Sequence, residues 1–106
     1  MITLYIRYTL DMYKISEFET YLKALVAPVS RCGGVPAGYY LPTNFAGPMN
    51  AAIGLTDFPD WAAYGAFREK MAVDPEGIEI RRRVEASGAI LSEDRSFLSV
   101  VPETRP

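Results

Sequence analysis

The chain has 106 residues, of which 49% are apolar and 23% charged, and its formal net charge is −2. This is the composition of one ordinary globular domain, long enough to bury a modest core without disulfides. The small net charge argues against binding to nucleic acid or to an anionic membrane. The absence of histidine excludes an imidazole base, the Ser–His and Cys–His nucleophile pairs and most zinc sites.

The N-terminal segment does not have the pattern of a signal peptide. It lacks a basic start and carries Arg7 within its apolar stretch. Residues 32–56 are uncharged over the length of a membrane span, but they contain five glycines, three prolines and two asparagines. Such residues favour strands and turns. The single cysteine requires no oxidising compartment, and we expect a cytoplasmic protein that does not contact a membrane.

The first half of the chain predicts a strand, a helix and a hairpin. Residues 2–9 alternate between aliphatic and polar side chains, which predicts a strand with one face in the core. Apolar residues at helical spacing over residues 15–29 predict an amphipathic helix capped by Asp11. We expect it to kink or end near Pro28, with Gly33-Gly34 as the stop signal. Residues 35–43 and 51–58 are rich in strand formers and predict a hairpin joined by a glycine-containing loop.

The second half predicts a helix in two parts and a final strand. Pro59 opens the helix, Asp74-Pro75 restarts it, and Ser87-Gly88 ends it. Residues 89–101 then predict the last strand. Because residues 92–96 are polar, a turn between two short strands is the alternative for this segment.

These elements follow one another as strand, helix, strand, strand, helix and strand. Two helices over one face of a four-stranded antiparallel sheet form an α+β domain of the ferredoxin-like βαββαβ type. We expect a single domain over residues 1–106.

Helices in this fold cover one side of the sheet, so the other side must be solvated, paired or wrapped around a ligand. The two-residue period of a strand puts Tyr5, Arg7 and Thr9 on this open side. A face with aromatic and charged residues suits neither bare water nor a dry core. We therefore expect two copies to close their sheets into a dimeric α+β barrel, a homodimer with a mixed-polarity interior. The further residues expected there are Tyr39, Leu41, Thr56, Phe58, Glu93, Arg95 and Phe97.

Three segments resemble the NIPSNAP family of the dimeric α+β barrel superfamily. They are YIRYTLDMYKISEFETYL, GGVPAGYY and GPMNAAIGLTDFPDWAAYGAFREKMAVDP, and the most specific positions within them are Gly47-Pro48, Asn50, Asp57-Phe58, Arg68 and Asp74-Pro75. These positions look like loop, cap and helix residues. The resemblance covers nearly the whole chain and implies the superfamily's range: cofactor-independent monooxygenases, isomerases of small lactones, haem enzymes and members without known chemistry.

One residue departs from the family pattern. Family members often carry an arginine where this chain has Ile6, and here the arginine stands one place later, at Arg7. Strand alternation turns it to the opposite side of the sheet. The lack of histidine further argues against those haem branches that use it as a ligand.

Three residues are the candidates for catalysis. Arg7 offers a planar bidentate donor that suits a carboxylate or an enolate-like oxygen, and its alternative is an ion pair with Glu93. Tyr39 is the candidate orienting donor, with packing as its alternative. Glu93 is the candidate general base if it is desolvated. The alternative base is Asp57, which is otherwise expected to cap the second helix.

Ligand binding is expected from Tyr5, Arg7, Tyr39 and Trp61, where Trp61 would form the wall of a pocket. We expect no cofactor and no metal, because carboxylates do not cluster at ligand spacing and no phosphate-binding glycine pattern occurs. The resemblance implies a protein without an assigned activity. If it is an enzyme, we expect a cofactor-independent monooxygenase or isomerase acting on a small aromatic or keto acid. The alternative is a non-catalytic protein that binds a small metabolite or only assembles.

Overall fold

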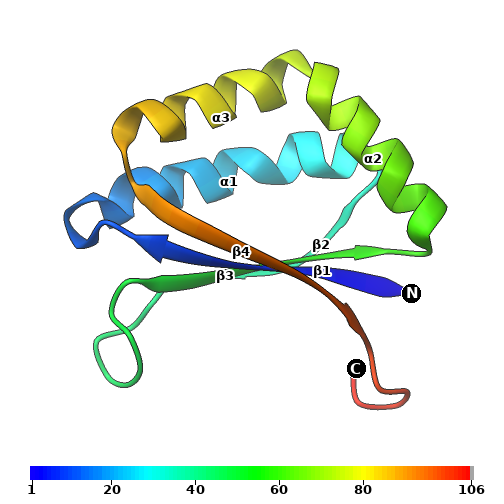
Figure 1. The fold of residues 1–106 in the computed structure, drawn as a ribbon, viewed down its shortest axis with the longest axis horizontal. Coiled ribbons are helices and arrows are strands. Elements are labelled where there is room, and N and C mark those ends of the chain that lie inside the picture. Colours follow the sequence, from blue (N-terminus) through cyan, green and yellow to red (C-terminus); the bar gives the residue numbers. More distant parts are fainter. Residues whose placement is uncertain (106) are drawn as a thin grey trace.

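The computed structural model describes residues 1–105 as two layers, a four-stranded antiparallel sheet with helices on one face (Figure 1). The strand order is β2-β3-β1-β4, so β1 and β3 are central and β2 and β4 are edges. The predicted α+β fold of ferredoxin-like βαββαβ type is confirmed. Its elements are β1 (Ile2–Leu10), η1 (Met12–Lys14), α1 (Ile15–Arg31), β2 (Val35–Tyr40), β3 (Ala51–Phe58), α2 (Trp61–Val73), α3 (Pro75–Ser87) and β4 (Ile90–Ser99).

The predicted second helix is two helices, each with its own aspartate cap. The Asp60 carboxylate accepts from the backbone N–H of Ala63 at 2.8 Å and starts α2. The Asp74 carboxylate accepts from the N–H of Gly77 at 2.8 Å and starts α3, with Pro75 in its first turn. A proline directly after the capping aspartate turns the chain between the two helices.

The end of α1 is fixed to this junction by an ion pair. The Arg31 Nη2 atom lies 2.7 Å from Oδ2 of Asp74, and its Nη2 also lies 3.3 Å from a carboxylate oxygen of Glu76. The hydrogen bonds from Arg31 and the N–H of Gly77 lower the pKa of Asp74. One carboxylate therefore caps α3 and holds it against α1.

The hydrophobic core lies between α1, α3 and the central strands. Phe18 of α1 is fully buried, and its ring meets that of Tyr8 edge to face at 4.8 Å. In contrast, α2 has no buried residue. It packs through an aromatic group in which Phe58 meets Phe67 at 4.9 Å and Tyr64 at 5.2 Å. The helix layer thus packs tightly at α1 and α3 and loosely at α2.

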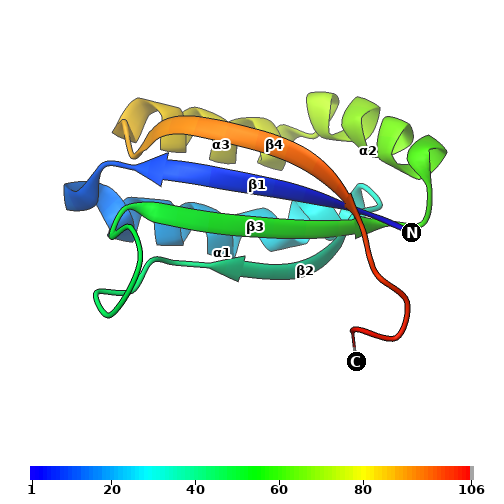
Figure 2. The same ribbon diagram turned by 60° about the horizontal axis from the view of Figure 1, so that its bottom comes forward.

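The other face of the sheet carries no helix (Figure 2). Register pairs on β1 put Tyr5 beside Leu55, and Arg7 beside both Ile53 and Asp94. The sequence-based assignment of Tyr5, Arg7 and Thr9 to the open face agrees with this register. Large apolar side chains are also partly exposed on this face, among them Val35, Tyr40 and Leu98.

The assignment of the other strands to the open face was wrong. The register pairs Leu4 with both Thr56 and Phe97, and Tyr8 with Glu93, so these residues share the helix-covered face. Three more residues expected on the open face lie on the covered side with them: Phe58 pairs with Ile2, Arg95 pairs with Ile6, and Leu41 packs against the core.

The physical reasons are register shifts and the composition of β3. In β4 the register shifts between Ile90 and Ser92, which puts Glu93, Arg95 and Phe97 on the covered side. The covered face of β3 carries Ala52, Gly54 and Thr56, whereas the bulkier Ile53 and Leu55 face outward. Hydrophobicity therefore does not reveal which set is inside. A register shift between Pro36 and Gly38 in β2 further breaks the simple alternation that was extrapolated to Tyr39.

The polar centre of β4 does not interrupt the strand. Glu93 to Ser96 pair continuously with β1, so the last element is one strand, as predicted. The chain then returns below the sheet (Figure 2), where Arg105 donates to both carboxylate oxygens of Asp57, at 3.2 and 2.8 Å. The Thr3 hydroxyl donates to the same carboxylate at 2.6 Å, and with Arg105 it lowers the pKa of Asp57.

Candidate ligand-binding cavity

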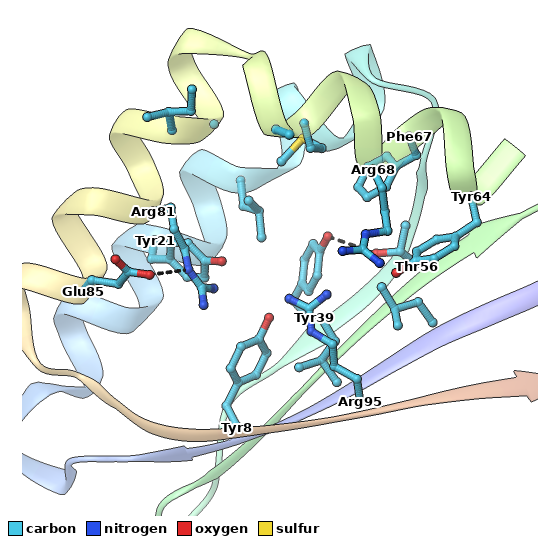
Figure 3. Close-up of a pocket in the computed structure, with 18 of the residues that line it drawn as sticks. Tyr8, Tyr21, Tyr39, Thr56, Tyr64, Phe67, Arg68, Arg81, Glu85 and Arg95 are labelled. Carbon is cyan, nitrogen blue, oxygen red and sulfur yellow. Dashed lines mark hydrogen bonds and ion pairs between the residues drawn. The ribbon is translucent and has the colours of Figure 1, made fainter.

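A cavity of about 590 Å³ lies between the covered face of the sheet and the helices (Figure 3). The loose packing of α2 leaves this volume, and the small residues of β3 deepen it. Its apolar surface comes from strand residues such as Leu4 and Ile6 and from helix residues such as Phe67 and Ile78. The polar lining residues are Tyr8, Tyr21, Tyr39, Thr56, Tyr64, Arg68, Arg81, Arg82, Glu85 and Arg95.

Three tyrosine hydroxyls point into the cavity from different elements (Figure 3). Tyr8 lies on β1, Tyr21 on α1 and Tyr39 on β2. Burial raises the pKa of all three phenols above the ordinary value of 10.0. The Tyr39 hydroxyl lies 3.5 Å from Oγ1 of Thr56, which slightly offsets this effect. All three phenols are therefore neutral at physiological pH and can donate hydrogen bonds to a ligand oxygen.

Arginines come from both layers. Arg68 extends from α2 and Arg81 from α3, while Arg95 rises from β4 (Figure 3). Burial disfavours the charge on Arg81, but the nearby Tyr21 and the carboxylates of Glu93 and Glu85 outweigh it and raise its pKa. These guanidinium groups carry positive charge at the boundary of an apolar space, where a ligand anion would be stabilised.

Glu93 is held by two of these arginines. Its Oε1 atom lies 2.7 Å from Nη1 of Arg81, and its Oε2 atom lies 3.4 Å from Nη2 of Arg95. The Oε1 contact is an ion pair without hydrogen-bond geometry, since this buried oxygen accepts no hydrogen bond within residues 1–105. Glu93 thus joins a charged network beside Tyr8, its register partner on β1.

The structure does not bring the predicted site residues together. Tyr39 lines the cavity and Glu93 lies on the same side of the sheet, but Arg7 and Tyr5 are on the open face. The expected pair of Arg7 with Glu93 is not formed, and within residues 1–105 Arg7 makes no salt bridge. Trp61 is 59% exposed and packs on Phe97 with ring centres 4.8 Å apart, next to the cavity but not lining it.

Tyr8, Tyr21, Arg68 and Arg81 are among the cavity residues that the sequence did not predict, because their patterns indicate core or surface. Tyr8 and Tyr21 belong to apolar faces, and Arg68 and Arg81 lie on helices rich in surface charge. One signal was available: a polar-tipped tyrosine on the otherwise aliphatic face of residues 2–8 needs a partner or a wet space. The mid-strand Gly54 also marked a place where something lies close to the backbone.

Within residues 1–105, no three His, Cys, Asp or Glu side chains gather in a way that could hold a metal ion. None of the helices in the described part of the chain has the length and apolarity to cross a bilayer.

The topology defines a ferredoxin-like α+β domain with a cavity between its helices and its sheet. The NIPSNAP family model matches residues 4–104, and the chain belongs to the NIPSNAP family. This confirms the resemblance found in the sequence. No curated protein sequence matches the chain.

Solved structures share the fold at low sequence identity. An uncharacterized NIPSNAP domain protein from Burkholderia xenovorans is similar over 100% of both chains, with a TM-score of 0.83 and 16% identity. A putative antibiotic biosynthesis monooxygenase from Nitrosomonas europaea has a TM-score of 0.72 and 9% identity over 95% of this chain and 99% of its own. SnoaB, a cofactor-independent oxygenase from Streptomyces nogalater, has a TM-score of 0.65 and 15% identity over 99% and 97%.

The Tyr39 ring packs directly against Gly54, where there is no room for a larger residue. A Cβ atom at Gly54 would lie 3.0 Å from Cδ1 and 3.1 Å from Cε1 of Tyr39, so the Gly54→Ala variant must displace the ring toward the cavity. We expect a loss of about 1–3 kcal/mol in the free energy of unfolding, measured by urea denaturation. The matched control is Gly65→Ala in α2, where nothing lies within 4 Å and a gain of about 0.5–1 kcal/mol is expected. Equal effects of the two substitutions would contradict the role of Gly54.

Proposed function

We propose that the cavity binds a small aromatic or keto acid. The observation that carries this proposal is the convergence of arginine side chains and neutral phenol hydroxyls over an apolar floor. Its volume of about 590 Å³ lies in the usual range for small-molecule sites. The aromatic walls fit a flat apolar group, and the polar groups fit oxygen atoms attached to it.

The charge balance of the lining favours an acid over a neutral ligand. The lining residues include four arginines and one glutamate. A guanidinium group at the edge of an apolar space gains most from an anion that supplies two acceptor oxygens in one plane, as a carboxylate does. An enolate oxygen is a second anion that the same donors stabilise.

We further propose that the bound acid is converted to an enolate, the intermediate shared by cofactor-independent oxygenation and isomerisation. Tyr39 would orient the acid by donating to its carboxylate, and Glu93 would remove the proton from carbon. Arg95 takes the role first considered for Arg7, because Arg7 lies on the open face and Arg95 lines the cavity. The fold shared with the oxygenase SnoaB supports this candidate. The alternative is that the protein binds the acid without converting it.

We also propose that the open face of the sheet is covered by a second copy of the chain. Three of its apolar residues, Val35, Tyr40 and Leu98, are about half exposed, at 58%, 56% and 47%. Arg7 and Asp94 are register neighbours on this face, and neither has a salt-bridge partner in the described chain. In a two-fold arrangement each could meet the opposite charge of the other copy, so the face is self-complementary.

If the cavity binds acids, phenylpyruvate should stabilise the folded protein against heat. Phenylacetone, which lacks the carboxylate, should not. Phenylpyruvate at ten times its dissociation constant should stabilise the fold by about 1.4 kcal/mol, or roughly 5 °C in Tm. The measurement is thermal unfolding followed by circular dichroism. Arg95→Gln should reduce the shift, and Arg83→Gln, an exposed residue of α3 that does not line the cavity, is the matched control. Equal shifts with the two compounds would show that the site does not recognise acids.

Enolate formation predicts faster exchange of the benzylic hydrogens of phenylpyruvate for deuterium in D2O. The rate, followed by proton NMR, should exceed the buffer rate about 100-fold or more. Glu93→Gln should abolish the enhancement and Tyr39→Phe should reduce it. Phenylpyruvate that binds but exchanges at the buffer rate would leave the non-catalytic alternative in place of the enzyme.

Self-association predicts a solution mass of twice the 11.8 kDa chain at micromolar concentration, measured by light scattering. Leu55→Asp introduces a charge at the centre of the open face and should raise the dimer dissociation constant at least tenfold. Val73→Asp, at an exposed position at the end of α2, should leave the mass unchanged. A monomeric mass of the unmodified protein would refute the dimer.

A further inference from the structure

The positive charge of the cavity is not evenly distributed, because its arginines differ in how fully they are neutralised. Arg81 has two carboxylate partners: its Nε lies 2.9 Å from Oε1 of Glu85, and its Nη1 lies 2.7 Å from Oε1 of Glu93. Two acidic side chains therefore surround one guanidinium. The other cavity arginine of α3, Arg82, lies 2.6 Å from a carboxylate oxygen of Glu79. The cavity end formed by α3 and α1 therefore carries no net positive charge for a ligand.

Arg95 is only partly neutralised. Its one ion-pair contact within residues 1–105 is the 3.4 Å approach to Glu93, which already serves Arg81. Arg68 has no ion pair with any carboxylate of the described chain. Its guanidinium points into the cavity beside the hydroxyls of Tyr39 and Thr56 (Figure 3). Unsatisfied positive charge is thus concentrated at the α2 end.

The opposite end offers hydrogen-bond donors without charge. Tyr8 and Tyr21 lie there, near Arg81 (Figure 3), and burial keeps both phenols neutral by raising their pKa. A neutral carbonyl or hydroxyl oxygen can accept from these phenols. A carboxylate would instead lie near the carboxylates of Glu85 and Glu93, where like charges repel.

We infer that the ligand is a monocarboxylate bound in one orientation, with its carboxylate at Arg68, Tyr39 and Thr56 and a neutral oxygen acceptor at Tyr8 and Tyr21. This inference rests on the proposed acid-binding function and narrows its substrate class. Acids with an uncharged carbonyl or hydroxyl at the far end are accepted, and dicarboxylates of the same length are rejected.

Three para-substituted benzoates of similar shape separate these features. 4-Acetylbenzoate has the distal carbonyl, 4-isopropylbenzoate lacks it, and terephthalate replaces it with a second carboxylate. By titration calorimetry we expect 4-acetylbenzoate to bind at least tenfold more tightly than terephthalate and several-fold more tightly than 4-isopropylbenzoate. Tyr8→Phe should remove most of the preference over 4-isopropylbenzoate. Terephthalate binding as tightly as 4-acetylbenzoate would overturn the inference.

The orientation is tested by Arg68→Gln, at an exposed position where folding should be retained. This variant should bind 4-acetylbenzoate at least tenfold more weakly, whereas Arg83→Gln, paired with Glu79 outside the cavity, should bind it as the unmodified protein does. Unchanged binding by Arg68→Gln would overturn the orientation while the acid-binding function stands. Failure of every benzoate and of phenylpyruvate to bind would overturn both.

Discussion

Small side chains along the inner face of β3 are the constraint on which the cavity depends. Ala52, Gly54 and Thr56 lie under the helices, and the Tyr39 ring fits over Gly54. Larger residues there would fill the space, as Phe58 does where α2 approaches the sheet. Successive side chains of a strand point to opposite faces, so Ile53 and Leu55, which alternate with these small residues, point outward. The inner cavity and the apolar outer face therefore have one origin.

The polar groups of the cavity follow from this arrangement. Charged and hydroxyl-bearing side chains at the edge of a core must find partners, and here Glu93 joins Arg81 and Arg95 into one network next to Tyr8. The network neutralises the charge at one end of the cavity and leaves the Arg68 end for a ligand. In this NIPSNAP protein, we therefore expect the position of a bound acid to depend on three arginines of different elements, whose charges are neutralised to different degrees.

The sequence was sufficient for the topology, because periodicity, caps and turn residues each marked an element boundary. Asp74-Pro75 between helices and Ser87-Gly88 at a helix end are examples. It was insufficient for the site. The strand phase of β1 was correct because its two faces differ in polarity. In contrast, β3 has apolar residues on both faces, and register shifts interrupt β2 and β4. Tyr39 and Glu93 were thereby grouped with Arg7, from which the sheet separates them.

The central claim is that an acid binds between the helices and the sheet, and not on the open face beside Arg7. A crystal of the protein soaked with 4-bromobenzoate tests this claim most directly. The bromine atom gives an anomalous signal that marks the ligand without ambiguity. We expect its peak inside the cavity, toward Tyr8 and Tyr21, with the carboxylate at Arg68. A peak on the open face of the sheet, or at α1 and α3 outside the cavity, would contradict this account.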